Sequence, residues 1–302
     1  MNIKKYIIFG ILIFSTVALF GEDGESGQPG AYLRLGYGVK ALGMGSAFTA
    51  IANDGSALLW NPAGLSQLKR TEISGMYSLL SLNRQQNFAS LTIPIQNFGS
   101  FGIGWLQYGV SDIDKRDTSG NPLGTFSDNE MAIIFGFGNK LGTIISYGAS
   151  AKYLTHSIDD KKASGLGFDF GFIIHDLMDM ISLGASLQSF SSYLKWDSDS
   201  KTREEIPSVI KTGLSIKIPQ FPLLLAADYE IMEKYYSKLH LGAECSLLKI
   251  LLLRAGYNGN NITAGCSFII KLKGSELQLD YAYDPISEID FSNHRVGISC
   301  KF

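Results

Sequence analysis

Beyond its N-terminal leader, the sequence lacks any long hydrophobic run. No stretch from Gly21 onward supplies the roughly 20 consecutive apolar residues that a transmembrane helix needs. Charge is also scarce, because only 18% of the 302 residues are charged whereas 45% are hydrophobic. The formal net charge is −2, which provides no basic surface for nucleic acid. These absences argue against a helical membrane protein, and they predict that nucleic acid is not a partner.

Cysteine is rare, with three residues in the whole chain. None lies near the leader, so the usual lipoprotein signal is missing. An odd count in an exported chain raises the question of a free thiol or an intermolecular bridge. Cys245, Cys266 and Cys300 all lie on the apolar face of an alternating segment, which favours three small hydrophobic side chains over a disulfide.

Motifs for catalysis are absent as well. A hydrolase triad needs a nucleophile, a histidine and a carboxylate or amide that converge in space. His156 and His294 lie at loop margins, and His175 lies in a predicted turn. His175, Asp176 and Asp179 suggest a metal site, but such groups in a turn are more often exposed to solvent. We find no zinc or nucleophile motif, so the sequence predicts no enzyme, no metal and no cofactor. The chain has four histidines, which are His156, His175, His240 and His294.

The N-terminus has the features of an export signal. Lys4 and Lys5 precede an apolar run from Tyr6 to Phe20, and the chain turns polar and glycine-rich from Gly21. A charged region followed by an apolar region is typical of a Sec signal peptide, which we predict over residues 1–21. An uncleaved membrane anchor is the alternative, although the run is shorter than a spanning helix needs.

Strict alternation of apolar and polar residues dominates the rest of the chain. In the last segment, Val296 and Ile298 fall on one face of an extended strand, while Arg295 and Ser299 fall on the other. Segments of about ten residues suit tilted strands that cross a bilayer. The alternation predicts fourteen strands, at 70–81, 85–95, 98–109, 127–138, 141–154, 164–174, 180–190, 206–218, 221–231, 236–247, 249–258, 261–271, 275–284 and 292–302.

The lengths of the connections alternate too. Connections after odd-numbered strands include long polar ones, at 110–126, 155–163, 191–205 and 285–291, whereas those after even-numbered strands are short. Long loops on one side and tight turns on the other are typical of an outer-membrane barrel. A soluble β-sandwich also alternates, but it has no reason to sort its loops in this way. We therefore expect an all-β fold, a 14-stranded antiparallel transmembrane β-barrel over residues 70–302.

The polar face of the predicted strands carries charges of both signs. A wall of mutually paired, solvated charges is favoured over a charge-selective pore, because no ring of a single sign is present. The inward positions are Lys152, Asp169, Lys211, Lys217, Asp228, Glu230, Lys238, His240, Glu244, Arg254, Glu276, Asp280 and Arg295.

Residues 22–69, between the leader and the first strand, are too ordered in composition for a linker. Small residues dominate, and Asp54-Gly55 and Asn61-Pro62 are turn signals. Small side chains let a folded segment pass close to a wall or thread a lumen. We expect this segment to form an N-terminal plug, or hatch, with short helices inside the barrel.

The same segment resembles a known family. The runs Lys40 to Phe48, Asn53 to Ala57 and Trp60 to Leu65 are similar to the hatch of the FadL superfamily. That superfamily includes FadL-type fatty-acid transporters, the PorV/PorQ group and the UPF0164 proteins. The strand count and the terminal Phe302 also agree with the family, whose fold is a fourteen-stranded barrel with an N-terminal plug. The outer loops are shorter here than in the typical fatty-acid transporter.

The resemblance assigns a role to one turn of the segment. The family's Asn-Pro-Ala motif maps onto Asn61, Pro62 and Ala63, which Gly64 follows. By the resemblance these residues belong to a gate, whereas the residues alone indicate a plain turn. The two interpretations are compatible, because a plug must turn.

A lateral exit is the second implication of the resemblance. In the family, the third strand bends inward and leaves a gap through which hydrophobic molecules exit. Its counterpart here, 98–109, contains Gly99, Gly102 and Gly104, and glycine inside a strand permits a bend. Small residues on the inner face of a crowded barrel are the alternative reason for these glycines.

The function implied is passive uptake of hydrophobic compounds, such as long-chain fatty acids, across the outer membrane. The alternative is a PorV/PorQ-like structural or secretion-associated scaffold, and a hydrophilic porin is a third possibility. The expected partners are outer-membrane lipid, hydrophobic small molecules and, for the scaffold, secretion or assembly proteins.

Overall fold

The fold is described from a computed structural model. The structure describes residues 27–80, 83–198, 201–232, 235–248, 250–286 and 291–302. The predicted signal peptide, residues 1–21, lies outside the described residues. Four short helices precede the strands: η1 (Ala31–Arg34), α2 (Val39–Gly43), α3 (Ala57–Trp60) and η2 (Pro62–Gln67). None of the described helices is long and apolar enough to cross a membrane.

Sixteen strands follow within the described residues. The first half are β1 (Glu72–Leu79), β2 (Arg84–Ile95), β3 (Gly99–Arg116), β4 (Pro122–Leu141), β5 (Ile145–Ile158), β6 (Lys161–Leu177), β7 (Ile181–Phe190) and β8 (Ser192–Trp196). The second half are β9 (Arg203–Ile206), β10 (Val209–Ile218), β11 (Leu223–Met232), β12 (Tyr236–Leu247), β13 (Leu251–Tyr257), β14 (Ile262–Leu272), β15 (Ser275–Ile286) and β16 (Phe291–Lys301).

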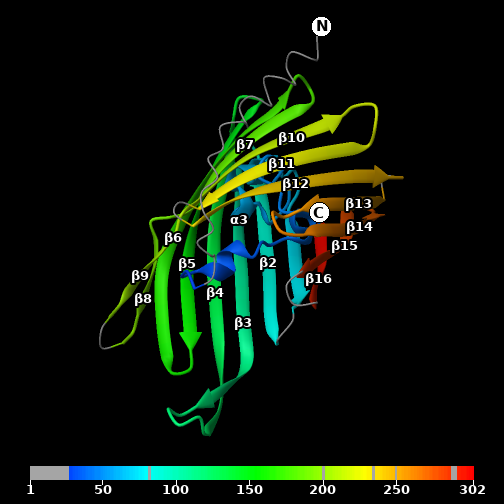
Figure 1. Cartoon of the computed structure of the whole chain (residues 1–302). Coiled ribbons are helices and arrows are strands. Elements are labelled where there is room, and N and C mark those ends of the chain that lie inside the picture. Colours follow the sequence, from blue (N-terminus) through cyan, green and yellow to red (C-terminus); the bar gives the residue numbers. More distant parts are fainter. Residues whose placement is uncertain (1–26, 81–82, 199–200, 233–234, 249, 287–290) are drawn as a thin grey trace.

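Fourteen of these strands, β1 to β7 and β10 to β16, form a closed antiparallel barrel (Figure 1). The ring closes because β1 pairs with β16, from Glu72 opposite Lys301 to Leu79 opposite His294. Closure removes the free strand edges that would otherwise expose unpaired backbone groups. β8 and β9 form a hairpin in the connection from β7 to β10 and are not among the fourteen ring strands. β8 pairs with the N-terminal part of β6.

The predicted strand pattern is confirmed, with a consistent error at one end of the barrel. All fourteen predicted segments are barrel strands, but 110–126 is largely strand, because β3 and β4 continue as a polar hairpin to a tip at 117–121. The region 191–205 holds the β8–β9 hairpin. The prediction relied on apolar alternation, which a hairpin outside the apolar belt does not need.

The two ends of the barrel differ, as the loop lengths predicted. We call the end with the β3–β4 tip and the β8–β9 hairpin the loop end, and the end with 142–144 and 178–180 the turn end. The β3–β4 hairpin projects beyond the other strands in Figure 1.

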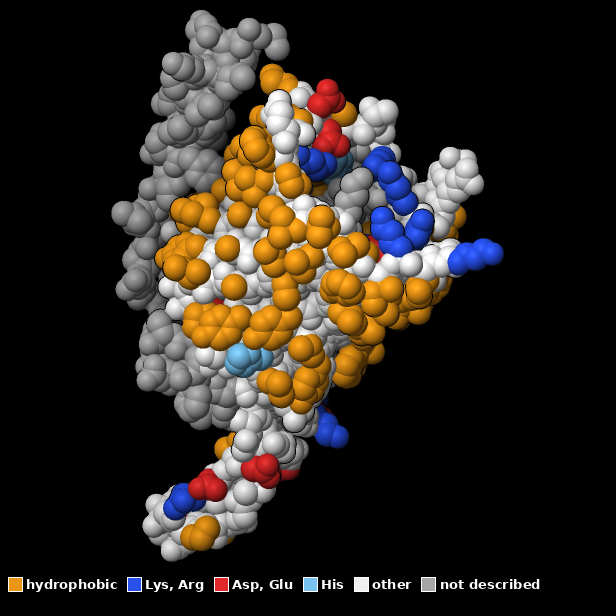
Figure 2. All heavy atoms as spheres, turned by 90° about the vertical axis from the view of Figure 1, so that its right-hand side faces the viewer, with side chains coloured by type: hydrophobic (Ala, Val, Ile, Leu, Met, Phe, Trp, Pro, Cys, Tyr) orange, Lys and Arg blue, Asp and Glu red, His pale blue; other side chains and the backbone are white. Residues whose placement is uncertain are grey.

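The outer face of the barrel is apolar. Hydrophobic side chains cover the face in Figure 2, and Phe135 and Ile298 are more than half exposed. This belt follows from the alternation, since every second residue of each strand points outward. Cys245, Cys266 and Cys300 occupy outward positions as free thiols, as the sequence indicated.

Candidate functional site

Residues 27–69, which we call the inner segment, fold against the inward-facing side of the barrel strands, which we call the wall. Figure 1 shows the segment within the ring of strands. Its helices are short because small residues and turns interrupt them. Asn61 caps η2, where its Oδ1 accepts the Ala63 N–H at 3.2 Å and Pro62 occupies the first helical position. A Cβ at Gly64 would overlap the carbonyl oxygen of Ala52.

Asn61 also joins the inner segment to the wall. Its Nδ2 donates to the carbonyl of Thr49 at 2.8 Å and lies 3.2 Å from the carbonyl oxygen of Ala185 on β7. The same amide lies 3.3 Å from the carbonyl oxygen of Phe172 on β6. Asn61 is fully buried, so these partners replace the water it would otherwise bind. The predicted turn is present as a buried joint, and a gating role for Asn61 to Gly64 stays a prediction.

Glycines on the wall make room for the inner segment. Among the described residues, twelve inward-facing glycines on ten strands would place a Cβ within 3.1 Å of a segment atom. A Cβ at Gly148 would overlap Pro62, and one at Gly184 would lie 2.5 Å from the Thr49 carbonyl oxygen. The segment therefore fits the wall at backbone distance. The twelve are Gly102, Gly104, Gly136, Gly138, Gly148, Gly171, Gly184, Gly213, Gly242, Gly256, Gly265 and Gly297.

The strand predicted as a lateral exit is closed in this conformation. β3 pairs with β2 without interruption from Gly99 to Val110, and with β4 from Ser100 to Val110. The expected gap at Gly99, Gly102 and Gly104 is therefore not present. Gly102 and Gly104 instead accommodate Leu58, whose Cδ atoms lie 3.0 and 3.1 Å from the Cβ positions of these glycines. These contacts agree with crowding of the inner face, the alternative reason, and a lateral exit beside β3 stays a prediction.

Polar side chains of other wall strands hold the inner segment. The Asp228 carboxylate on β11 accepts the backbone N–H groups of Phe48 at 2.8 Å and Thr49 at 2.7 Å. His240 on β12 donates to the carbonyl of Gly45 at 3.1 Å. Glu72 on β1 accepts the N–H of Gly55 at 2.8 Å.

The charges predicted on the inner face do form pairs. Lys152 and Asp169 lie 2.6 Å apart, and Lys211 and Glu230 also lie 2.6 Å apart. The pairing is confirmed, but these four side chains are buried rather than solvated, because the segment and the wall exclude water from them. Toward the turn end, Lys217 is exposed.

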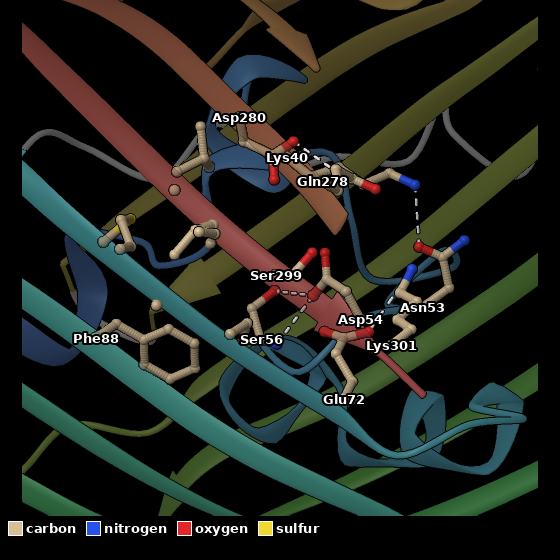
Figure 3. A pocket seen from close by; sticks show the side chains of 17 residues that line it. Lys40, Asn53, Asp54, Ser56, Glu72, Phe88, Gln278, Asp280, Ser299 and Lys301 are labelled. Carbon is tan, nitrogen blue, oxygen red and sulfur yellow. Dashed lines mark hydrogen bonds and ion pairs between the residues drawn. The ribbon is translucent and has the colours of Figure 1, made fainter. Parts of the chain in front are cut away.

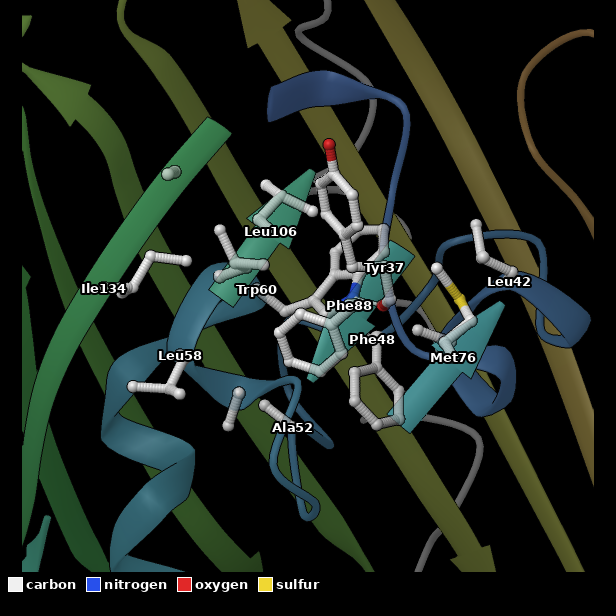
Figure 4. Close-up of a cluster of buried hydrophobic side chains, with 14 of the residues drawn as sticks. Tyr37, Leu42, Phe48, Ala52, Leu58, Trp60, Met76, Phe88, Leu106 and Ile134 are labelled. Carbon is white, nitrogen blue, oxygen red and sulfur yellow. Dashed lines mark hydrogen bonds between the residues drawn. The ribbon is translucent and has the colours of Figure 1, made fainter. Parts of the chain in front are cut away.

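Strands β2 to β5 make a large apolar contact with the inner segment, beside polar contacts such as that of Gln86. Figure 4 shows Leu58 and Trp60 of the segment among Phe88, Leu106 and Ile134 of the wall. Phe48 meets Trp60 edge to face, with ring centroids 6.3 Å apart. We call this contact the apolar seam. It comprises Tyr32, Tyr37, Leu58, Trp60 and Leu65 of the segment and Phe88, Leu106, Ala132, Ile134 and Leu154 of the wall.

The apolar seam extends along β4 from Met131 to Gly138. Near the loop end, the Tyr32 hydroxyl donates to the carbonyl of Met131 at 3.1 Å. Toward the turn end, Leu65 packs at Gly138. Burial raises the pKa of Tyr37 well above its usual value, so the phenol stays neutral within the seam.

The cavities beside the segment are polar. One of about 110 Å³ lies between the segment and β1, β15 and β16, where Figure 3 shows Lys40 and Asn53 near Glu72 and Lys301. A second, also of about 110 Å³, lies toward the loop end and is lined by charged groups that include Lys238. A third, of about 220 Å³, lies at the turn end. Polar lining suits water better than apolar ligands.

His175 is not in a turn, contrary to the sequence prediction. It lies within β6, is buried, and shares a hydrogen bond of 2.7 Å with Ser146, because β6 extends past the expected strand end. Ser66 of the inner segment lies 2.6 Å from Ser146, between the two Oγ atoms. No group of three or more His, Cys, Asp or Glu side chains among the described residues is placed to hold a metal ion.

Several contacts of the inner segment were missed from the sequence. Gln188 on β7 donates to the carbonyls of Leu59 and Trp60, both at 2.8 Å, and Gln86 on β2 donates to the carbonyl of Gly36 at 2.9 Å. The available signal was the recurrence of glycine at inward positions of successive strands, which marks close backbone approach.

Comparison with known proteins supports the fold. No family model matches the chain, and no curated protein matches it. Among solved structures, the toluene transporter TbuX of Ralstonia pickettii is similar, with a TM-score of 0.60 and 13% identity over 88% of this chain and 97% of that one. The deltaS2S3 mutant of the monoaromatic hydrocarbon channel TodX has a TM-score of 0.59 and 15% identity over 88% of this chain and 98% of that one. A Pseudomonas aeruginosa FadL homologue has a TM-score of 0.57 and 11% identity over 87% and 97%.

These similarities extend over nearly the full length of each barrel. At this low identity they establish a common architecture and leave the function of this chain to be argued from its own residues. The chain therefore has the fold of the FadL-type channels.

Proposed function

We propose that this protein is a passive outer-membrane channel for hydrophobic small molecules, whose path follows the apolar seam. The observation that supports this proposal is the apolar seam, the apolar contact between the inner segment and β2 to β5. Apolar side chains of β2 to β5 meet the inner segment along the seam, whereas carboxylates such as Asp228 on β11 and Glu72 on β1 bind its backbone elsewhere. A hydrophobic molecule loses least free energy where it displaces other apolar groups.

The placement in the membrane rests on the outer face. Its apolar belt suits lipid, and closure of the ring satisfies the strand backbone inside a bilayer. In this proposal residues 1–21 are the Sec signal peptide, residues 22–69 are the plug, and residues 70–302 are the barrel.

The described conformation is a closed one in this proposal. The glycines of β3 and β4 are occupied by Leu58 and Leu65, and β3 is paired along the membrane-spanning stretch. Passage therefore requires the segment to separate from β3 and β4 along the apolar seam. Asn61 to Gly64, at one margin of the seam, form the joint about which the segment would move.

The proposed substrate class stays as general as the sequence resemblance implies. The solved structures of this fold include channels for toluene and other monoaromatic hydrocarbons. We therefore propose hydrophobic compounds in general, with monoaromatic hydrocarbons and long-chain fatty acids as the two classes to compare. No contact or cavity of the described residues favours the secretion scaffold, and we do not pursue it.

The first test is mass spectrometry of lipophilic compounds that co-purify with the protein in detergent. The proposal predicts one or more compounds enriched over a control barrel purified in the same way. The second test is uptake of labelled toluene or oleate by cells that produce the protein. Ile134→Asn places an amide in the apolar seam and should reduce uptake severalfold.

The matched control for uptake is Val209→Asn. Val209 is also buried and inward-facing, but it belongs to a separate apolar cluster on β10 to β12. At equal amounts of folded protein in the membrane, this variant should take up substrate as the unmodified protein does. Equal uptake by Ile134→Asn, together with no enriched compound, would rule out the proposal.

A further inference from the structure

The inner segment and the wall have no separate apolar cores. The segment's helices have four to six residues, far shorter than a helix that is stable alone in water. Conversely, the inward apolar residues of the wall, such as Phe88, Leu106 and Ile134, are buried in one cluster with Leu58 and Trp60 of the segment. Each part therefore buries its apolar surface only by contact with the other.

Inward-facing glycines of the wall surround the inner segment on nearly all sides. The twelve inward glycines lie on β3 to β7, β10, β12 to β14 and β16, so nearly every sector of the ring touches the segment. Glycine inside a strand is destabilising relative to alanine, because it loses more conformational freedom on folding. A wall that formed by itself would be more stable with alanine at these positions. Glycine at these positions favours the wall only when the segment occupies the space that an alanine Cβ would fill.

Polar side chains of the wall also depend on the segment for their hydrogen-bond partners. Asp228 receives two backbone N–H groups of the segment, and Glu72 receives one. Gln188 donates to two segment carbonyls. These side chains are spread over β11, β1 and β7, and each would lose its segment partner if the barrel closed while empty.

The closing pair of strands also touches the segment. A Cβ at Gly297 on β16 would lie 2.8 Å from Val39, and Glu72 on β1 binds Gly55. We propose that residues 27–69 are an internal assembly core, on which the strands align before β1 and β16 pair to close the barrel. This role is separate from transport and does not depend on the proposed function.

Single alanines at the wall glycines test the proposal in the full chain. A Cβ at Gly148 overlaps the backbone of Pro62, so Gly148→Ala should slow barrel folding by about tenfold or more. The matched control is Gly75→Ala on β1, where the nearest atom to the new Cβ is 3.8 Å away. The control should fold at least as fast as the unmodified protein, because alanine is the better strand residue.

A compensating pair keeps the test informative if Gly148→Ala does not fold at all. A Cβ at Gly136 would lie 2.4 Å from Leu58 Cδ2, and Leu58→Ala removes that overlap and leaves Leu65 Cδ1 at 3.1 Å. Gly136→Ala should slow folding in the unmodified background and slow it much less in a Leu58→Ala background. This dependence on a segment residue is what an assembly core requires.

The measurement is refolding of the urea-unfolded protein into lipid vesicles, with folded barrel detected by its altered mobility in unheated gels. Trypsin cleavage near Lys69 reports separately whether the segment is docked. Slow folding of Gly148→Ala and relief of Gly136→Ala by Leu58→Ala would support the assembly core. Barrel formation at the unmodified rate, with only the segment becoming open to trypsin, would overturn it.

Discussion

Removal of one partner of the Lys152–Asp169 ion pair tests whether the barrel interior around the pair is dry or filled with water. The two side chains lie 2.6 Å apart, with exposed fractions of 2% and 0%. Asp169 also accepts the N–H of Ser189 at 2.7 Å and the hydroxyl of Ser150 at 3.1 Å. Lys152→Met removes the cation and leaves the carboxylate buried without a counter-charge.

The expected cost follows from that burial. Removing one partner of a buried ion pair costs about 3–5 kcal/mol of unfolding free energy, because the remaining charge cannot be hydrated. Lys152→Met/Asp169→Asn removes both charges and keeps an oxygen that accepts the Ser189 N–H. The double variant should therefore be more stable than Lys152→Met alone by roughly 2 kcal/mol.

The assay is urea unfolding in lipid vesicles, followed by tryptophan fluorescence. Lys161→Met is the control, because Lys161 and its partner Asp160 are exposed at the loop end, and it should leave the unfolding midpoint unchanged. If water filled the barrel beside β5 and β6, Lys152→Met would cost about 1 kcal/mol or less, as exposed pairs do. That result, or further loss of stability on adding Asp169→Asn, would refute the reasoning.

Three other predictions address the joint, the outer face and the loop end. Asn61→Ala removes the cap of η2 and the amide contacts with β6 and β7, so it should lower stability by roughly 1–3 kcal/mol and speed trypsin cleavage of the inner segment; unchanged cleavage would contradict the joint. Cys245 and the other two cysteines should react with a lipid-soluble maleimide, and labelling by a membrane-impermeant one in intact vesicles would count against their outward position. Hydrogen bonds from Asn121 lower the pKa of Asp117. The turn at the β3–β4 tip should therefore be fully stable at pH values above the ordinary aspartate pKa, and it should be lost as the pH falls through the lowered pKa. An ordinary aspartate midpoint in an NMR titration of Asp117 would contradict this.

Much of the barrel was predictable because alternation is enforced by its two environments. Outward residues such as Ile298 form the apolar belt and inward residues such as Arg295 are buried inside the barrel, so each strand alternates with a period of two. The polar hairpin of β3 and β4 beyond Val110 does not alternate between apolar and polar residues, so the sequence predicts a loop there. The long connections after odd-numbered strands predict which end of the barrel carries the hairpins.

The candidate site was predictable only in part. Small residues around Asn61 indicated a segment that packs closely, and the structure places it against the wall. The sequence of β3 does not say what fills the space at Gly102, because a glycine that permits a bend and one that receives Leu58 look alike. Contacts between residues far apart in the chain, such as Asp228 with Phe48, leave no local pattern.

A disulfide that locks the inner segment tests the transport path most directly. Ser66 of the segment and Ser146 of β5 lie with their Oγ atoms 2.6 Å apart at the turn-end limit of the apolar seam, so paired cysteines there should form a disulfide. The control pair, at Ser74 and Ser90, has its Oγ atoms 2.7 Å apart and joins the wall strands β1 and β2. Both hydroxyls lie beside Gly55 of the segment, but a disulfide between them leaves the segment without a covalent link to the wall. Both pairs are placed in a chain whose three outward cysteines are replaced by alanine.

The decisive measurement is uptake of labelled toluene and oleate before and after reduction of the disulfide. The account predicts that oxidised Ser66→Cys/Ser146→Cys takes up little substrate and that reduction restores uptake, while Ser74→Cys/Ser90→Cys is unaffected in either state. Uptake by the locked protein at the rate of the unlocked one would contradict a path along the apolar seam.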